Sequence, residues 1–108
     1  MTADAMIPDY AEKVLSLAES IPPGRVMTYG DVAEWLGEGG PRQVGRVMSH
    51  YGGSVPWWRV VRADGVILPG SETRALAAYR DEDTPLRTPA SGVTRIDMAL
   101  ARWDGRTT

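Results

Sequence analysis

Residues 28–51 read TYGDVAEWLGEGGPRQVGRVMSHY, and this stretch decides the fold. Thr28 is followed three residues later by Asp31, a near match to the capping box that opens many helices. This spacing predicts a helix over Gly30–Leu36. Gly37 follows directly and is the residue type that most often ends a helix, because it adopts a left-handed backbone without strain.

A second helix is expected to begin near Pro41 and to run to about Tyr51, because proline suits the first helical position. Its apolar face consists of Val44, Val47, Met48 and Tyr51. The opposite face consists of Arg42, Gly45, Arg46 and Ser49. Two helices joined by a short glycine-rich connection, the second with a cationic outer face, are typical of a helix-turn-helix.

Gly45 lies between the two arginines of that outer face. A glycine inside a helix costs about 1 kcal/mol relative to alanine, so its presence indicates that the backbone approaches a neighbour closely. Another protein helix and a nucleic-acid groove would both explain it. The alternative interpretation of Arg42 and Arg46 is an ordinary solvated helix face.

The flanking sequence predicts the remaining elements. A helix is expected over residues 9–21, and a hairpin is expected in which Val55–Arg62 leads into a turn and Val66–Leu68 returns. A further helix should start at Ser71 and end near Glu82. Residues 83–92 are interpreted as a linker, and the helical spacing of Ile96, Ala99, Leu100 and Trp103 predicts a short docking helix in the tail.

The fold class predicted from these elements is α+β, a small winged-helix-like domain with a helix-turn-helix and a short hairpin. We expect residues 1–82 to form the DNA-binding domain. Residues 83–108 are expected to supply a linker and a C-terminal docking helix of the same domain.

Composition narrows the possible chemistry. The chain has 108 residues, a formal net charge of −2, no cysteine and one histidine. The absence of cysteine excludes disulfides, thiolate metal sites and a cysteine nucleophile, and we expect no cofactor and no metal. The first ten residues have neither a basic start nor a hydrophobic stretch, so we expect no secretory signal, no membrane partner and a cytoplasmic location.

The segment Pro56-Trp57-Trp58-Arg59 is unusual. If it is a strand, adjacent side chains point to opposite faces, so both tryptophans cannot be buried in one place. One indole should therefore line a cleft or the surface, where its flat face suits stacking against a base.

Three blocks together carry a resemblance to a known family. They are IPPGRVMTYGDVA at residues 21–33, PRQVGRVM at residues 41–48 and VPWWRVV at residues 55–61. In this order and spacing they resemble the C-terminal domain of O6-alkylguanine-DNA alkyltransferases, over about residues 10–79.

The resemblance also implies a loss of chemistry. In active alkyltransferases the third block reads Pro-Cys-His-Arg-Val, and its cysteine takes the alkyl group. Trp57 stands at the cysteine position here, and an indole cannot form a thiolate nucleophile. The chain is therefore similar to the alkyltransferase-like proteins, which bind O6-alkylguanine without repairing it and hand the lesion to nucleotide excision repair. No enzyme activity is expected.

Site residues follow from the same resemblance. Arg42 matches the arginine that enters the duplex in place of the flipped nucleotide, and Tyr29 matches the tyrosine that packs against the target phosphate. Gly45 and Arg46 lie on the recognition helix, which in this family enters the minor groove. The implied lesion pocket comprises Tyr29, Met48, Trp57 and Ser71.

Two positions depart from the pattern of active alkyltransferases. Trp58 replaces the histidine that usually follows the cysteine. The segment Gly52–Val55 lacks the asparagine that braces the active site. Both departures are consistent with a loss of alkyl-transfer activity.

The implied partners are double-stranded DNA containing O6-alkylguanine and nucleotide excision repair proteins. A monomer is expected, nucleoid-associated when it is bound to DNA. Two alternatives stay open at this point: a winged-helix regulator without damage specificity, and an interaction module that has lost DNA binding. Preference for alkylated DNA and salt-dependent DNA affinity would distinguish them.

Overall fold

The helix-turn-helix comprises α2 (Tyr29–Leu36) and α3 (Pro41–Tyr51). The Thr28 hydroxyl accepts a hydrogen bond from the Asp31 backbone N–H at 2.8 Å, and the Asp31 carboxylate accepts one from the Thr28 N–H at 3.0 Å. The predicted capping box is therefore confirmed, as is the left-handed Gly37 that ends α2, with a φ of 70°. The computed structural model describes residues 8–106. The expectations for residues 1–7 and 107–108, including the absence of a signal sequence, lie outside the described residues.

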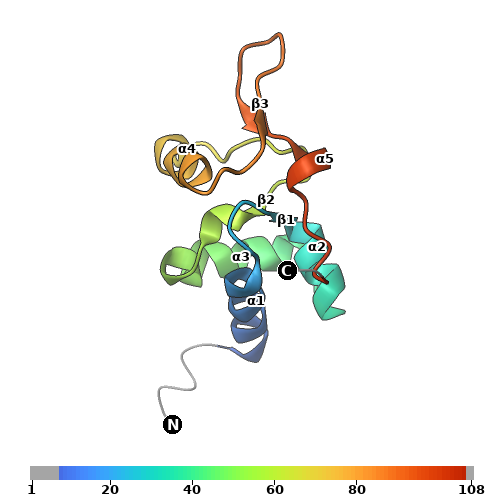
Figure 1. Cartoon of the computed structure of the whole chain (residues 1–108). Coiled ribbons are helices and arrows are strands. Elements are labelled where there is room, and N and C mark those ends of the chain that lie inside the picture. Colours follow the sequence, from blue (N-terminus) through green and yellow to red (C-terminus); the bar gives the residue numbers. More distant parts are fainter. Residues whose placement is uncertain (1–7, 107–108) are drawn as a thin grey trace.

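Helix α1 (Asp9–Ser20) follows Pro8 and confirms the predicted first helix. Two carboxylates, Asp9 and Glu12, lie in its first turn, where they complement the positive end of the helix dipole. The three helices pack together around a first hydrophobic cluster, and Figure 1 shows them grouped in the lower part of the molecule. Its fully buried members include Val14, Val32 and Val44.

The predicted hairpin over residues 55–68 is wrong. Strand β2 (Val60–Val61) pairs in parallel with β1 (Met27–Thr28), in the register Met27 with Val60 and Thr28 with Val61. Residues 66–68 form no strand. The prediction failed because a short apolar run after a turn suggests a local partner, whereas the strand that pairs with β2 precedes the helix-turn-helix in the chain.

A hairpin does occur, with its first strand in the segment interpreted as a linker and its second strand just beyond that segment. Strand β3 (Leu86–Arg87) pairs antiparallel with β4 (Arg95–Ile96), and the loop between them projects from the top of the molecule in Figure 1. Helix α4 (Glu72–Asp81) precedes it and matches the predicted fourth helix. Ser71 occupies its N-cap position without a side-chain cap.

The tail contains a short helix, α5 (Met98–Ala101), which is shorter than the helix predicted from the spacing of Ile96 to Trp103. Ile96 belongs to β4 and Trp103 follows the helix, while Leu100 is 66% exposed. The spacing of these residues therefore does not describe one helical face. The docking of the tail is nevertheless extensive, because Trp103 is buried in the first cluster and Val26 bridges to Arg102.

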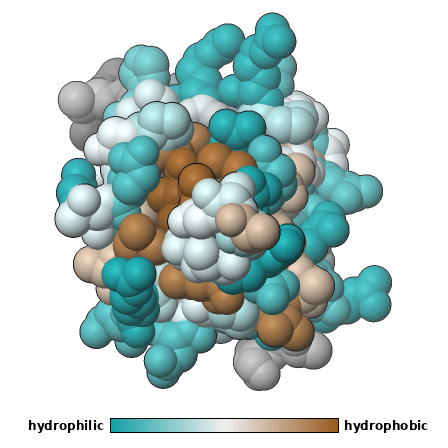
Figure 2. Space-filling model, turned by 90° about the horizontal axis from the view of Figure 1, so that it is seen from above, coloured by the Kyte–Doolittle hydropathy of each residue, from teal (hydrophilic) through white to brown (hydrophobic). Residues whose placement is uncertain are grey.

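A second hydrophobic cluster lies between α4, the hairpin and α5. Its buried members are Val26, Val61, Ala75, Tyr79, Ile96 and Ala101. Viewed from above, this end of the molecule has hydrophobic side chains at its centre within a surround of hydrophilic ones (Figure 2). The buried members of the second cluster are nevertheless each at most 4% exposed.

Candidate nucleic-acid interface

The outer face of α3 is basic and open. Arg42 and Arg46 are exposed, and neither forms an ion pair within residues 8–106. Helix α3 contains no aspartate or glutamate. A cationic helix face without local carboxylates is what a phosphate backbone requires of a recognition helix.

Gly45 has no neighbour inside the protein that requires a glycine. A Cβ built at this position would meet no atom within 4 Å among the described residues. Close packing of another element of this chain therefore does not account for the glycine. The packing of residues 8–106 therefore gives no reason for a glycine at this position.

The arginines of the central region divide into two groups. Arg25 donates to the Ala101 and Arg102 carbonyls at 3.1 and 2.7 Å, and Arg59 is committed to a buried ion pair. These two arginines hold the fold together. The accessible cations of this region are Arg42, Arg46 and Arg62, of which Arg62 pairs with Asp64 at 3.0 Å.

Trp57, Trp58 and Arg59 form a short 3-10 helix, η3, instead of a strand. The expectation that the two indoles face apart is therefore wrong. Their rings meet edge to face, with centroids 5.5 Å apart and planes at 86°, an arrangement favoured by the aromatic quadrupole. Each ring also has a guanidinium nearby: Arg74 lies 5.3 Å from the centroid of Trp57, and Arg59 lies 5.7 Å from that of Trp58.

Two of the four predicted pocket residues line one cavity. Trp57 and Ser71 contribute to it together with Trp58 and the segment Val66–Leu68, and its volume is about 20 Å³. This space holds about one water molecule and is far too small for a purine base. In this conformation the cavity is therefore closed to a nucleotide.

Tyr29 and Met48, the other two predicted pocket residues, lie outside that cavity. Both are half-buried and pack against the first cluster. Burial raises the pKa of Tyr29 above its ordinary value, and the nearby positive charge of Arg62 opposes this effect. Tyr29 is therefore a neutral phenol at physiological pH, placed at the first residue of α2.

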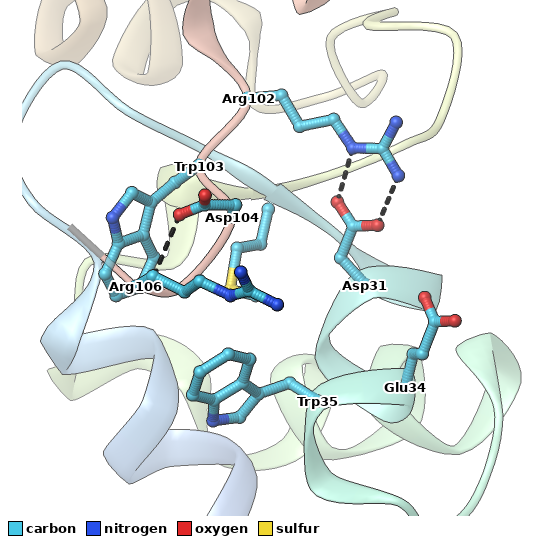
Figure 3. A pocket seen from close by; sticks show the side chains of 8 residues that line it. Asp31, Glu34, Trp35, Arg102, Trp103, Asp104 and Arg106 are labelled. Carbon is cyan, nitrogen blue, oxygen red and sulfur yellow. Dashed lines mark hydrogen bonds and ion pairs between the residues drawn. The ribbon is translucent and has the colours of Figure 1, made fainter.

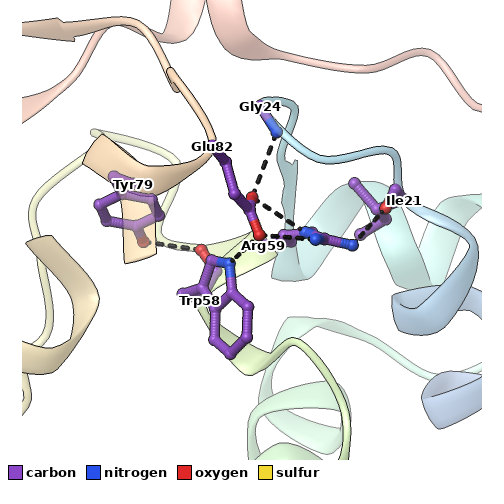
Figure 4. A network of polar contacts seen from close by, with 6 residues as sticks. All are labelled: Ile21, Gly24, Trp58, Arg59, Tyr79 and Glu82. Atoms are coloured by element: carbon purple, nitrogen blue, oxygen red, sulfur yellow. Dashed lines mark hydrogen bonds and ion pairs between the residues drawn. The ribbon is translucent and has the colours of Figure 1, made fainter. Parts of the chain in front are cut away.

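A buried polar network surrounds Trp58 and Arg59, the residues that follow Trp57 (Figure 4). The Glu82 carboxylate accepts hydrogen bonds from Arg59 at 2.6 and 3.1 Å, from the Trp58 indole at 2.9 Å and from the Gly24 N–H at 3.2 Å. Arg59 also donates to the Ile21 carbonyl at 2.8 Å. The Tyr79 hydroxyl donates to the Trp58 carbonyl at 2.7 Å.

The charges of this network are mutually satisfied. The side chains of Arg59 and Glu82 are only 13% and 10% exposed. Burial alone would raise the pKa of Glu82, but the hydrogen bonds from Arg59, Trp58 and Gly24 outweigh it, and the pKa lies below its ordinary value. The network joins η3 to the end of α4 and to the turn after α1.

The sequence patterns did not reveal Glu82 or Arg74. Glu82 lies in the acidic run Asp81–Asp83, which looks like a solvated helix end. Arg74 is one of several exposed charges on α4. Only the spatial positions of Trp57 and Trp58 distinguish these two residues from their neighbours.

A family model described as the DNA-binding domain of 6-O-methylguanine DNA methyltransferase matches residues 9–82, more than half of the chain. The chain belongs to this family. It is also 34% identical over 119 residues to the "DNA base-flipping protein" of Escherichia coli K12, covering 92% of this chain and 90% of that protein. It is 28% identical to "Alkyltransferase-like protein 1" of Schizosaccharomyces pombe, covering 88% and 94%.

The alkyltransferase-like chain also resembles a solved structure of that fission-yeast protein. The structure is of Atl1 in complex with damaged DNA containing O6-carboxymethylguanine, with a TM-score of 0.75 and 28% identity. The match covers 95% of this chain and 98% of that one. The predictions of an alkyltransferase-like protein and of an α+β fold with a helix-turn-helix are confirmed.

Residues 8–106 contain neither a membrane span nor a cluster of metal ligands. No helix in this range is both long and apolar enough to cross a membrane. No three histidine, aspartate or glutamate side chains in the same range gather as a metal ion would require.

Proposed function

We propose that this alkyltransferase-like protein binds duplex DNA containing O6-alkylguanine, turns the modified base out of the stack and holds it without removing the alkyl group. The observation that carries the proposal is the open basic face of α3, where Gly45 lies between two unpaired arginines without any internal reason to be glycine. The likeness to Atl1, which was solved with damaged DNA containing O6-carboxymethylguanine, supports the same class of ligand.

In the proposed complex α3 enters the minor groove. Gly45 allows the helix backbone to approach the groove floor, and Arg46 contacts phosphates. Arg42 enters the stack at the position of the flipped nucleotide, and Tyr29 packs as a neutral ring against its phosphate. Flipping a base costs a few kcal/mol, and the cost is lower for a modified guanine that pairs poorly.

Trp57 forms the wall of the proposed lesion pocket, with Arg74 beyond it. An indole offers an apolar contact to the alkyl group, and no thiolate exists in the chain to attack it. Because the cavity at Trp57 and Ser71 holds only about 20 Å³, a base can enter only if the segment Val66–Ser71 moves away from Trp57. Met48 would approach the base from α3.

The bound DNA is then bent and carries an extruded base. We propose that this deformation marks the lesion for nucleotide excision repair proteins. The protein acts as a monomer in the cytoplasm, on the nucleoid. Residues 83–108 belong to the same domain as residues 1–82, which is supported by the burial of Trp103 among the residues of α1, α2 and α3.

The decisive experiment is a titration of the protein with two matched duplexes, one containing O6-methylguanine and one containing guanine, at fixed salt. Preference for the modified duplex is expected. Equal affinity would support the winged-helix regulator instead, and no salt-dependent binding to either duplex would support an interaction module.

A further inference from the structure

A second surface surrounds Trp35 on α2. The Trp35 side of the molecule has two neighbouring hollows that share this indole. The first, of about 490 Å³, lies between α2 and the C-terminal segment and includes Glu34 and Asp104. The second, of about 580 Å³, lies along α1 and includes Asp9 and Glu12. We call this surface the Trp35 face.

The Trp35 indole is held in position although it is 50% exposed. The backbone of Gly105 lies against the ring so closely that a Cβ there would be 2.6 Å from it. Arg102 donates to Asp31 from Nε at 2.9 Å and anchors the same segment to α2. Figure 3 shows Trp35 and Trp103 on opposite sides of the hollow, with Arg106 between them. The aromatic surface is therefore preformed.

The unpaired charge of the Trp35 face is negative. Lys13 is paired with Glu38, and Arg102 is paired with Asp31. Arg106 is the cation that remains against this surface. Four carboxylates that line the hollows form no ion pair within residues 8–106: Asp9, Glu12, Glu34 and Asp104.

No residue of α3 lines either hollow. The acidic Trp35 face and the basic outer face of α3 therefore belong to different sides of the helix-turn-helix. DNA phosphates attract the α3 face and repel the carboxylates, which leaves the Trp35 face uncovered when DNA is bound.

We propose that the Trp35 face binds a basic segment of a partner protein. Lysine or arginine side chains of that segment pair with Glu12, Glu34 and Asp104, and an apolar or guanidinium group lies on the Trp35 ring. Charge complementarity identifies the binding partner. The carboxylates around the exposed Trp35 ring attract a cationic peptide and repel the phosphates of a nucleic acid. This inference does not depend on lesion recognition, so either can fail alone.

The test uses isotope-labelled full-length protein and a short fluorescein-labelled peptide of repeated Lys-Lys-Leu. A peptide with glutamine in place of each lysine controls for apolar binding. Amide and indole shifts are expected to concentrate on α1, α2 and the Trp35 side chain, whose indole signal is assigned with W35F. The variants Glu34→Lys and Trp35→Ala should each weaken peptide binding by at least about fivefold.

The matched control is Asp81→Lys, which reverses an exposed charge on α4, away from the Trp35 face. It should change peptide affinity less than about twofold, as expected where no direct contact is lost. An equal loss in Asp81→Lys and Glu34→Lys would mean nonspecific attraction to an acidic protein and would overturn the proposal. Amide shifts centred on another surface would also overturn the proposal.

A second arm repeats the titration with the protein saturated by DNA. The Trp35 indole signal should still shift on peptide addition, because the Trp35 face lies away from α3. Loss of this shift in the DNA complex, with the peptide in excess over the amount that the DNA itself binds, would overturn the proposal. Sedimentation of the free protein completes the test: concentration-dependent dimers abolished by Trp35→Ala would assign the surface to a second copy of this chain instead.

Discussion

The Trp58 indole donates its N–H to Oε2 of Glu82 at 2.9 Å, although the two residues are separated by 24 positions in the chain. This bond gives Trp58, for which the sequence resemblance implies the histidine position of active alkyltransferases, a structural partner. The neighbouring Trp57 packs instead beneath Arg74. The two adjacent tryptophans therefore have different polar partners, although both line the same small cavity.

Mutation of each tryptophan should reveal this difference. Trp57→Ala should reduce the ratio of affinities for O6-methylguanine and guanine duplexes, because the apolar contact to the alkyl group is lost. Trp58→Ala should instead lower the free energy of unfolding by about 3 kcal/mol, since it removes packing and leaves a hydrogen-bond acceptor of Glu82 unfilled. Denaturant unfolding and duplex titration of both variants check this. If Trp58→Ala alone abolished the preference, the pocket assignment would be reversed.

No alkyl transfer is expected. The chain has no cysteine, and the indole of Trp57 is not a nucleophile at neutral pH. After incubation with an O6-methylguanine oligonucleotide, the intact mass of the protein should be unchanged. A stable gain of one methyl group, mapped to Trp57 or to any other residue, would contradict the proposed function.

Arg42→Ala should weaken binding to the alkylated duplex by about 1–3 kcal/mol, as expected for a base contact. Its effect on unfolding should stay within about 0.5 kcal/mol, because the side chain is exposed and forms no ion pair among the described residues. Arg80→Ala, which removes an exposed charge from α4, is the matched control for net charge. If both variants lost the same amount of affinity for the alkylated duplex, Arg42 would contribute only through the overall positive charge of the protein and not through a base contact.

Gly45→Ala should separate stability from binding. The added Cβ meets no atom of the protein within 4 Å, so the variant should be more stable by about 0.5–1 kcal/mol through helix propensity alone. Affinity for DNA should fall, because the same methyl group obstructs a close approach to the groove. Thermal unfolding and duplex titration measure the two effects. A stabilised variant with unchanged DNA affinity would remove Gly45 from the interface.

Glu82 should make stability sensitive to acid. Its pKa is lowered in the folded state, so the stabilisation that it provides is complete above its ordinary value of 4.5 and is lost as the pH falls toward the lower folded value. Glu82→Gln should destabilise the protein by about 3 kcal/mol near neutral pH, because Arg59 is left buried without its counter-charge. It should also flatten the acid limb of the stability profile, as measured by denaturant unfolding at a series of pH values. Asp81→Asn, at an exposed neighbouring position, should leave that limb unchanged.

The helix-turn-helix could be predicted because its determinants are local. Thr28 and Asp31 cap each other across three residues, and Gly37 and Pro41 mark the next helix end and start. Each of these features depends on residues within one or two turns. The exposed face of α3 could also be predicted, because its apolar and polar residues recur with the spacing of a helix.

The environment of Trp57 could not be predicted in this way. It depends on the parallel pairing of β1 with β2, on the 3-10 turn of η3 and on the position of Glu82, which are separated by tens of residues. Alternation along an assumed strand gave the wrong orientation for the two indoles. The β3–β4 hairpin was missed because its strands are two residues each, within a proline-bearing polar segment.

The burial of Trp103 has a consequence for synthesis of the chain. Its indole completes the hydrophobic cluster of α1, α2 and α3, and Tyr51, the last residue of those helices, precedes it by more than fifty positions. At ribosomal rates, on the order of 5–20 residues per second, this separation corresponds to several seconds. We expect the apolar surface that Trp103 covers to stay exposed on the nascent helix-turn-helix during that interval, and to be buried only after Trp103 has left the ribosome.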